Sequence, residues 1–358
     1  MRILIVAGAT PLPTNPARGT FVADHARLLR TAGHEVRILN ALPWMRPFQE
    51  ARRSTLTGVA RAPSHFRHED VDVDVVRYLG FPEQTLPALT RLSVRRAARM
   101  SRRRLGDWAP DHVISHTIWP VALVAEHLAR EAGIPWTIVV HGWDADVGMH
   151  HTLIRGHVAR LAHRASSLVC VTEGLTQPFR SVGIEAVIIP CHLAVPEERR
   201  QPIRRYRGRW RQDRLELVFP GDPRRPEKNY QLFLETGREL ERRGWQVHHT
   251  TFMQQPREVV WDRLSTLDAM IMTSTREGGP LLPREAIALG MPVASVDVGD
   301  LRTWLPLSCV SIPVPESLAD SLECAISADR IVSPLPSEFE PISVKYRWDE
   351  LLGEATPA

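Results

Sequence analysis

One stretch of this chain, residues 269–299, constrains the fold more than any other. The apolar run 269–272 predicts a buried parallel strand, and Gly278, Gly279 and Pro280 predict a turn after it. Pro283 predicts the start of a short helix and Gly290 its end, before a second strand at 293–296. In such a unit the first N–H groups of the helix and the positive end of its dipole face the region above the strand. The stretch therefore predicts a parallel α/β domain with a site for a phosphate or for sugar hydroxyls.

Two carboxylates frame this turn: Glu277 precedes the glycines and Glu285 lies on the helix, with seven residues between them. Both positions can line the cleft at the end of the strand. Carboxylates accept hydrogen bonds from pairs of hydroxyls, which suits the recognition of a sugar or a ribose. Taken alone, two such glutamates are more often a charge at a helix start and a solvated side chain.

The run 277–299, EGGPLLPREAIALGMPVASVDVG, resembles the Glu-x7-Glu signature of the retaining GT-B glycosyltransferases of family four, which use nucleotide-sugar donors. The resemblance implies an α/β protein of GT-B fold, in which two Rossmann-like domains face each other across a cleft. It implies that Glu277 is catalytic and holds hydroxyls of the donor sugar, and that Glu285 binds the ribose. The other donor-binding residues that it implies in this run are Gly278, Gly279, Leu281 and Leu282.

Length and composition agree with a two-domain protein in a reducing compartment. A chain of 358 residues exceeds one ordinary domain. No apolar run has the length of a membrane span, and residues 2–7 read as a strand and not as a signal peptide. The four cysteines are scattered without a Cys-x-x-Cys pair, which favours free thiols. We expect a cytoplasmic protein.

The basic residues are almost all arginines, since only Lys228 and Lys345 are lysines. The arginines are not interleaved with aromatic residues as in a nucleic-acid-binding module, so no nucleic-acid partner is expected. A helix predicted over residues 87–105 carries seven of them. Such a helix is either a solvated face or a contact with an anionic membrane. A peripheral contact at the inner face of the membrane therefore stays open.

The first domain begins as a βαβ unit, with a strand at 2–8, a helix at 20–32 and a strand at 35–40. It lacks the Gly-x-Gly-x-x-Gly fingerprint, which counts against a nicotinamide or flavin site, and we expect no cofactor. Residues 16–39 are similar to the opening of GT-B proteins, which implies that the backbone of Gly19 lies near the donor phosphates. Further strands are predicted at 69–78, 113–115, 136–140, 168–172 and 186–190, with a helix at 120–130.

The tetrapeptide His141-Gly-Trp-Asp144, which follows the strand at 136–140, resembles the His-Gly-x-Asp motif of the same family. The resemblance implies that His141 is catalytic and faces the donor sugar and the acceptor, and that Trp143 and Asp144 lie on the acceptor side. A histidine at a strand end can donate a hydrogen bond or carry a proton at neutral pH. The Asp-x-Asp strings at 70–74 and 144–146 could suggest a metal. Alternation explains the first, and GT-B enzymes generally need no bound metal, so no metal site is expected.

The expected domains are residues 1–195, an interdomain linker at 196–214, a second domain at 215–342, and a final helix at 343–358 that crosses back to the first domain with Trp348 as its anchor. The second domain opens with a strand at 215–219, a helix at 230–242, a strand at 247–252 and a helix at 257–264. The loop 220–229 resembles the diphosphate-binding loop of the family. That resemblance implies donor-binding roles for Arg225 and Lys228, with Arg224 as an alternative.

The resemblance implies a retaining glycosyltransferase that moves a sugar from a nucleoside diphosphate sugar to an acceptor. The acceptor is a small molecule, a glycan or a lipid-linked precursor. Two other classes stay open: a GT-B epimerase, which would turn over a nucleotide sugar without an acceptor, and a non-catalytic partner subunit. The intact carboxylate pair argues against the second of these.

Overall fold

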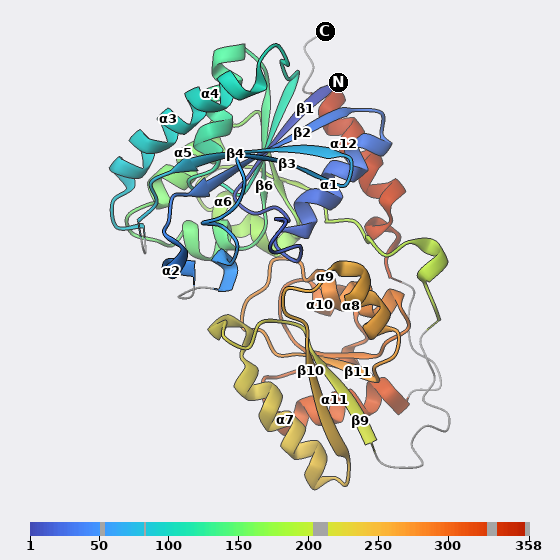
Figure 1. The fold of residues 1–358 in the computed structure, drawn as a ribbon. Coiled ribbons are helices and arrows are strands. Elements are labelled where there is room, and N and C mark those ends of the chain that lie inside the picture. The colour runs from blue at the N-terminus through green and yellow to red at the C-terminus, as the bar shows by residue number, and fades with distance from the viewer. Residues whose placement is uncertain (51–53, 82–83, 203–213, 328–334, 355–358) are drawn as a thin grey trace. The chain divides into compact units, whose positions relative to one another are not determined.

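The computed structural model describes residues 1–50, 54–81, 84–202, 214–327 and 335–354. The chain divides into two compact units (Figure 1). The first unit comprises Met1–His192 and Pro341–Ala358, and the second comprises Leu193–Glu340. Each unit is built on its own largely parallel sheet, so the predicted α/β fold with two Rossmann-like sheets is confirmed.

The sheet of the first unit has the strand order β3-β4-β2-β1-β5-β6-β7-β8 within the described residues. Its pairs are parallel except β3 with β4. The central strands are almost fully buried because helices pack against them, as in other parallel sheets. The strands are β1 (Arg2–Ala7), β2 (Glu35–Pro43), β3 (His65–His68), β4 (Val71–Tyr78), β5 (His112–His116), β6 (Trp136–Val140), β7 (Ser167–Cys170) and β8 (Val187–Ile188).

The helices predicted at 20–32, 87–105 and 120–130 are present with ends shifted by at most two residues, whereas the helices at 47–50, 155–164 and 177–180 were not predicted. Gly19 precedes the first one, and Gly133 ends α4 in the left-handed conformation that glycine adopts without strain. They are α1 (Thr20–Thr31), α2 (Pro47–Glu50), α3 (Pro87–Leu105), α4 (Ala122–Ala132), α5 (Arg155–Arg164), α6 (Gln177–Arg180) and α12 (Pro341–Glu354), with a π-helical turn η3 (Asp144–Gly148). The strand β3 was not predicted, because its four residues, HFRH, are half-exposed and too polar to show a pattern.

The final helix α12 returns to the first unit and packs against α1 (Figure 1). Its inward side chains belong to the hydrophobic core of that unit, and Trp348 is 3% exposed. The helix begins at Pro341, two residues before the predicted start. Proline suits a first helical position because its missing N–H would have no partner there.

The sheet of the second unit is parallel throughout, with the order β10-β9-β11-β12-β13 within the described residues. Its strands are β9 (Arg214–Phe219), β10 (Gln246–Thr251), β11 (Ala269–Met272), β12 (Val293–Val296) and β13 (Val310–Ser311). Its helices are α7 (Tyr230–Arg242), α8 (Arg257–Leu264), α9 (Leu281–Ala288), α10 (Leu301–Trp304) and α11 (Pro315–Ser327), and a 3-10 turn η7 (Pro226–Lys228) precedes α7.

The elements α10, α11 and β13 of the second unit were not predicted, and the start of one helix differs from the prediction. Helix α9 begins at Leu281, so Pro283 lies inside its first turn and not at its start; a proline is tolerated there because that N–H has no helical partner. The predicted linker lies partly in 203–213, outside the described residues. Its described part packs on the second unit, where the Gln201 N–H donates to the Ala288 carbonyl at 2.9 Å and Arg200 pairs with Glu340 at 2.9 Å.

Candidate active site

In the second unit, Lys228 and Glu277 form an ion pair at the carboxyl ends of two neighbouring strands. The lysine follows β9 and the glutamate follows β11, and these strands are paired. The Lys228 Nζ lies 2.5 Å from a Glu277 carboxylate oxygen, and the two side chains are only 13% and 14% exposed. The chain leaves β9 for β10 on one side, while β11 lies on the other. This reversal of strand order is where open α/β sheets bind their ligands.

The loop that carries Lys228 is fastened to the end of β11. The Thr273 hydroxyl donates to the backbone carbonyls of Lys228 at 3.0 Å and Asn229 at 3.1 Å. The Thr275 N–H donates to the Glu227 carbonyl at 2.9 Å. Gly221 makes room for the lysine, because a Cβ at that position would lie 3.0 Å from the Lys228 Cγ. These contacts fix the backbone of Lys228, and the ion pair with Glu277 places its ammonium group.

The predicted diphosphate loop also holds Arg225, whose guanidinium pairs with Glu227 at 2.6 Å and remains 38% exposed. Its neighbour Arg224 pairs with Asp222 at 2.9 Å and is more exposed. The arginine nearer to Lys228 in the chain is thus also the more enclosed one.

The turn after β11 approaches a second loop closely. A Cβ at Gly299, which has a φ of 62°, would lie 3.3 Å from the Glu277 Cβ and 3.1 Å from the Pro280 Cδ. Gly278 is buried and Gly279 half-buried before α9, and Leu281 and Leu282 form the half-buried first turn of that helix. The N–H groups of Leu281 and Leu282 have no helical partner, because the first N–H groups of a helix have no carbonyl one turn before them. The predicted donor-binding residues of this run therefore lie together beside Glu277.

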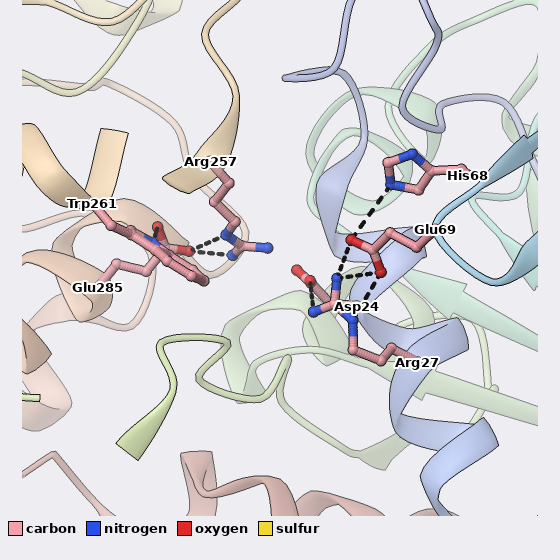
Figure 2. Close-up of polar contacts among 7 residues, drawn as sticks. All are labelled: Asp24, Arg27, His68, Glu69, Arg257, Trp261 and Glu285. Atoms are coloured by element: carbon pink, nitrogen blue, oxygen red, sulfur yellow. Dashed lines mark hydrogen bonds and ion pairs between the residues drawn. The ribbon is translucent and has the colours of Figure 1, made fainter. Parts of the chain in front are cut away.

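The second carboxylate, Glu285, is buried and accepts hydrogen bonds from α8 (Figure 2). The Arg257 Nε donates to it at 3.1 Å, Arg257 Nη2 makes a second, shorter contact, and the Trp261 indole N–H donates at 2.9 Å. The Arg257 guanidinium also lies 5.3 Å from the centre of the Trp261 ring. Arg257 and Trp261 were not predicted, because they come from another helix and no motif marks them. Glu285 thus joins α9 to α8.

In the first unit, His141 follows β6 directly and is hydrogen-bonded to another histidine. Its Nε2 lies 2.8 Å from the Nδ1 of His116, the last residue of β5. The Phe21 ring lies 4.4 Å from the His141 ring, centre to centre. Burial lowers the pKa of His141 from 6.5 to about 3, so the ring is neutral at physiological pH. His116 was missed, although its position at the end of a strand beside β6 could have indicated it.

The two residues predicted on the acceptor side differ in exposure. Trp143 is 36% exposed, whereas Asp144 is fully buried. The Asp144 carboxylate accepts the Ile118 N–H at 2.7 Å, and burial raises its pKa to about 6. Asp144 therefore holds the loop after β5 through a buried hydrogen bond, while Trp143 lies at the surface.

Gly19 fits against the loop that follows β1. It has a φ of 59°, and a Cβ there would lie 2.4 Å from the carbonyl carbon and oxygen of Ala9. The neighbouring Arg18 is half-buried against the same loop, where it donates to the Gly8 carbonyl at 2.5 Å and the Thr10 carbonyl at 3.3 Å. A glycine is required here by the chain's own backbone, and its predicted approach to donor phosphates stays a prediction.

Two further findings bear on the predicted absence of a metal and of a membrane span. Among the described residues, no group of three or more His, Cys, Asp and Glu side chains is arranged to hold a metal ion. None of the helices in the described part of the chain is both long and apolar enough to cross a membrane.

Comparison with known proteins assigns each unit. Residues 19–192 match the model of a glycosyl transferase 4-like domain, and residues 205–304 match that of glycosyl transferases group 1. The chain is 24% identical over 329 residues to TuaC of Bacillus subtilis (strain 168), provisionally named a teichuronic acid biosynthesis glycosyltransferase. The match covers 85% of this chain and 82% of TuaC.

The fold is shared with solved structures, among them the following two. Sucrose-phosphate synthase from Thermosynechococcus elongatus superposes with a TM-score of 0.70 at 14% identity, covering 99% of this chain and 98% of that one. Anabaena HepE, in complex with UDP and glucose, superposes with a TM-score of 0.64 at 16% identity, covering 99% of this chain and all of HepE. The chain is therefore a glycosyltransferase of GT-B fold, with a glycosyl transferase 4-like domain followed by a glycosyl transferases group 1 domain.

Proposed function

We propose that this enzyme transfers a sugar from a nucleoside diphosphate sugar to an acceptor with retention of the anomeric configuration. The observation that carries the proposal is the Lys228–Glu277 pair, held by the backbone at the strand-order reversal of the second unit. An ammonium beside a carboxylate offers what a sugar diphosphate requires, namely a positive charge for the diphosphate and an acceptor for sugar hydroxyls. Binding of UDP and glucose by Anabaena HepE, which shares the fold, supports this choice of donor.

The chemical difficulty of the reaction is the charge that develops on the leaving diphosphate as the glycosidic bond breaks. Positively charged groups and N–H groups that are already in position before the bond breaks stabilise this charge and lower the activation barrier most. In our proposal Lys228, Arg225 and the first N–H groups of α9 meet it, and Glu277 holds hydroxyls of the transferred sugar. Glu285 binds the ribose with one of its remaining lone pairs, since a carboxylate has about four acceptor sites and three are used here. Gly19 lies near the phosphates.

His141 acts on the reacting face in this proposal, and Trp143 contacts the acceptor. A neutral imidazole can donate a hydrogen bond to a sugar hydroxyl without holding a charge in a buried place. The acceptor is a cell-envelope precursor or a small secondary metabolite; TuaC, named for teichuronic acid biosynthesis, favours the former. We place the enzyme in the cytoplasm, in keeping with its free cysteines.

Thermal unfolding with a panel of UDP-, GDP- and ADP-sugars tests the donor. A ligand at a hundred times its Kd stabilises the folded chain by about 2.7 kcal/mol, which is a clear shift in Tm. We expect sugars of one nucleotide base to raise Tm. The double variant Glu277→Gln with Lys228→Ala should not show this rise. The anomeric configuration of the product, read by proton NMR, tests retention. No shift with any sugar nucleotide would contradict the proposal, and turnover without an acceptor would favour an epimerase.

We further propose that α3 lies against an anionic membrane. Its outward stripe, at spacings of three and four residues, is apolar in the first half and basic in the second: Leu89, Leu92, Arg96, Arg99 and Arg103 are all exposed. Leu89 is 50% exposed and Leu92 is 65% exposed, so both leucines are available to an apolar partner. A helix of this kind buries its leucines at the headgroup level while its arginines meet anionic lipids.

Sedimentation with vesicles rich in phosphatidylglycerol tests the membrane contact. Replacing Arg95, Arg96, Arg99 and Arg103 with glutamine should abolish binding, because each basic residue at such a surface contributes about 1 kcal/mol. Activity on a soluble acceptor should remain. A control with the same loss of charge replaces exposed arginines elsewhere: Arg130, Arg238, Arg242 and Arg302. Failure of the wild type to bind, or equal loss in the control, would refute the contact.

A further inference from the structure

Three histidine rings of the first unit form a hydrogen-bonded row that ends at His141. The His25 Nδ1 lies 2.9 Å from the His116 Nε2, and the His116 Nδ1 lies 2.8 Å from the His141 Nε2. His25 belongs to α1, which follows β1. His116 is the last residue of β5, and His141 directly follows β6. The strand order reverses between β1 and β5, so the row lies where a parallel sheet binds ligands.

All three rings are neutral at physiological pH. Burial lowers the pKa of His141 and of His25 to about 3 and that of His116 well below its usual 6.5. The other titratable groups acting on these rings are histidines as well: His192 and His141 act on His25, and His141 and His25 act on His116. Three neutral imidazoles offer one N–H and one lone pair each.

Two bonds between three neutral rings leave two possible arrangements of the protons. In the first, each ring carries its proton on Nδ1 and donates toward His141, which then presents Nδ1–H outside the row. In the second, each ring carries its proton on Nε2 and donates toward His25, which leaves His141 with a bare Nδ1. The ring nitrogen of His141 that carries the proton is therefore determined by the tautomer of His25, at the far end of the row.

The far end of the row favours the first arrangement. The His25 Nε2 is buried and has no hydrogen-bond partner among the described residues. The Trp348 ring of α12 packs 4.3 Å from the His25 ring, centre to centre. A buried N–H without an acceptor is rarer in proteins than an acceptor without a donor. A buried polar group that makes no hydrogen bond costs about 1–3 kcal/mol of stability. The proton of His25 therefore belongs on Nδ1.

Helix α1 holds His25 in place through ion pairs on either side of it. Arg27 donates through Nη2 to Glu69 at 2.6 Å and through Nε at 3.0 Å, and it pairs with Asp24 at 3.4 Å (Figure 2). Glu69, with a φ of 51°, forms the turn between β3 and β4, and His68 lies 4.0 Å from its carboxylate. A rotation of α1 about its axis would break these contacts and would move the His25 ring away from His116.

We propose that His116 and His25 are positioning residues that keep the proton of His141 on Nδ1, so that His141 is a hydrogen-bond donor to the sugar or the acceptor. The use of that donor rests on the proposed function, whereas the position of the proton does not. Within the described residues the His141 Nδ1 has no hydrogen-bond partner, which leaves it available to a substrate. Without the row, either ring nitrogen of a neutral histidine could carry the proton.

Nitrogen-15 NMR of histidine-labelled enzyme tests the position of the proton, because the two tautomers give different patterns of ring couplings. The His141 signals are identified by their loss in His141→Gln. We expect the Nδ1–H pattern in the wild type. His116→Phe, which can neither donate nor accept, should lose that pattern and lower kcat by roughly tenfold to a hundredfold, as loss of an outer partner of a functional histidine does, with little change in KM for the nucleotide sugar.

His116→Gln should recover both the pattern and much of kcat, since the amide carries a donor and an acceptor. His112 provides the control: it is buried on the same strand, bonded to Thr137 at 2.9 Å, and outside the row, so His112→Gln should keep the pattern and kcat. A proton on Nε2 of His141 in the wild type, or an unchanged pattern in His116→Phe, would overturn the proposal. No transfer by a wild type that shows the Nδ1–H pattern would overturn the proposed function and support the positioning role.

Discussion

Replacement of Lys228 separates its contribution to the fold from its contribution to the reaction. Lys228→Ala removes the ammonium from a pair in which both side chains are largely enclosed, so Glu277 remains with a poorly solvated charge. An enclosed charge without its partner costs about 1–3 kcal/mol of stability. Loss of one group that stabilises developing charge lowers kcat/KM by about a hundredfold, or about 2.7 kcal/mol.

The double variant Lys228→Met with Glu277→Gln distinguishes the two effects. It removes both charges, so stability should return toward that of the wild type while transfer stays abolished. Lys228→Arg should restore only part of the activity, because the stem runs over Gly221 in a space that suits an unbranched ammonium chain better than a planar guanidinium. The control is Lys345→Ala: Lys345 pairs with Asp349 on α12 and is 32% exposed, a pair worth at most about 1 kcal/mol.

The assay is donor turnover at equal folded concentration, with urea unfolding of each variant in parallel. Full activity of Lys228→Ala would refute the diphosphate assignment. Recovery of activity in the double variant would show that the lysine acts by neutralising Glu277 and not by binding the donor. Loss of activity in Lys345→Ala would mean that the assay responds to charge in general.

Three other predictions concern the two carboxylates, the need for a metal ion, and the buried histidines. Glu277→Gln should fold and lose transfer, whereas Glu285→Ala should weaken donor binding and also lower Tm, because it removes the carboxylate that pairs with the largely enclosed Arg257. Equal Tm values in the two variants would contradict this. Turnover should persist in excess chelator, since Arg225 and Lys228 supply the positive charge; loss that is reversed by Mn²⁺ or Mg²⁺ would contradict it. Stability should fall as the pH drops from 6.5 toward 3, by about 1.4 kcal/mol per pH unit for each of His25 and His141, because the unfolded chain binds the protons that the buried rings exclude. Asp144, with its pKa raised to about 6, opposes this trend between pH 3.8 and 6. Urea midpoints at pH 7 and pH 5 measure the balance, and a higher midpoint at pH 5 would refute it.

The sequence was sufficient for features that depend on neighbouring residues. The strand at 269–272 and the helices at 87–105, 230–242 and 257–264 have their predicted bounds, because apolar periodicity and capping residues are local signals. The start of α9 was misplaced because two leucines before Pro283 can already adopt helical geometry. The position of Lys228 beside Glu277 follows from the pairing of β9 with β11, while the donor-binding role of this loop stays a prediction.

Contacts between distant residues could not be predicted in this way. Nothing in the sequence near Glu285 indicates that Arg257 and Trp261 occupy its carboxylate. The row of histidines joins residues 25, 116 and 141, which only the strand order brings together. Parallel strands place their carboxyl ends at one edge of the sheet, so polar residues at several predicted strand ends are a signal that a sequence analysis can use.

The return of α12 to the first unit has a consequence for the order in which the protein folds as it is synthesised. The second unit is one continuous segment, whose ends meet where the Leu193 N–H donates to the Phe339 carbonyl at 2.7 Å. It can complete its contacts as soon as Glu340 has left the ribosome. The first unit, although made earlier, lacks Trp348 and its neighbours in the core until helix α12 emerges. The first unit is therefore completed after the second, and the ring of His25 stays without its Trp348 contact until then.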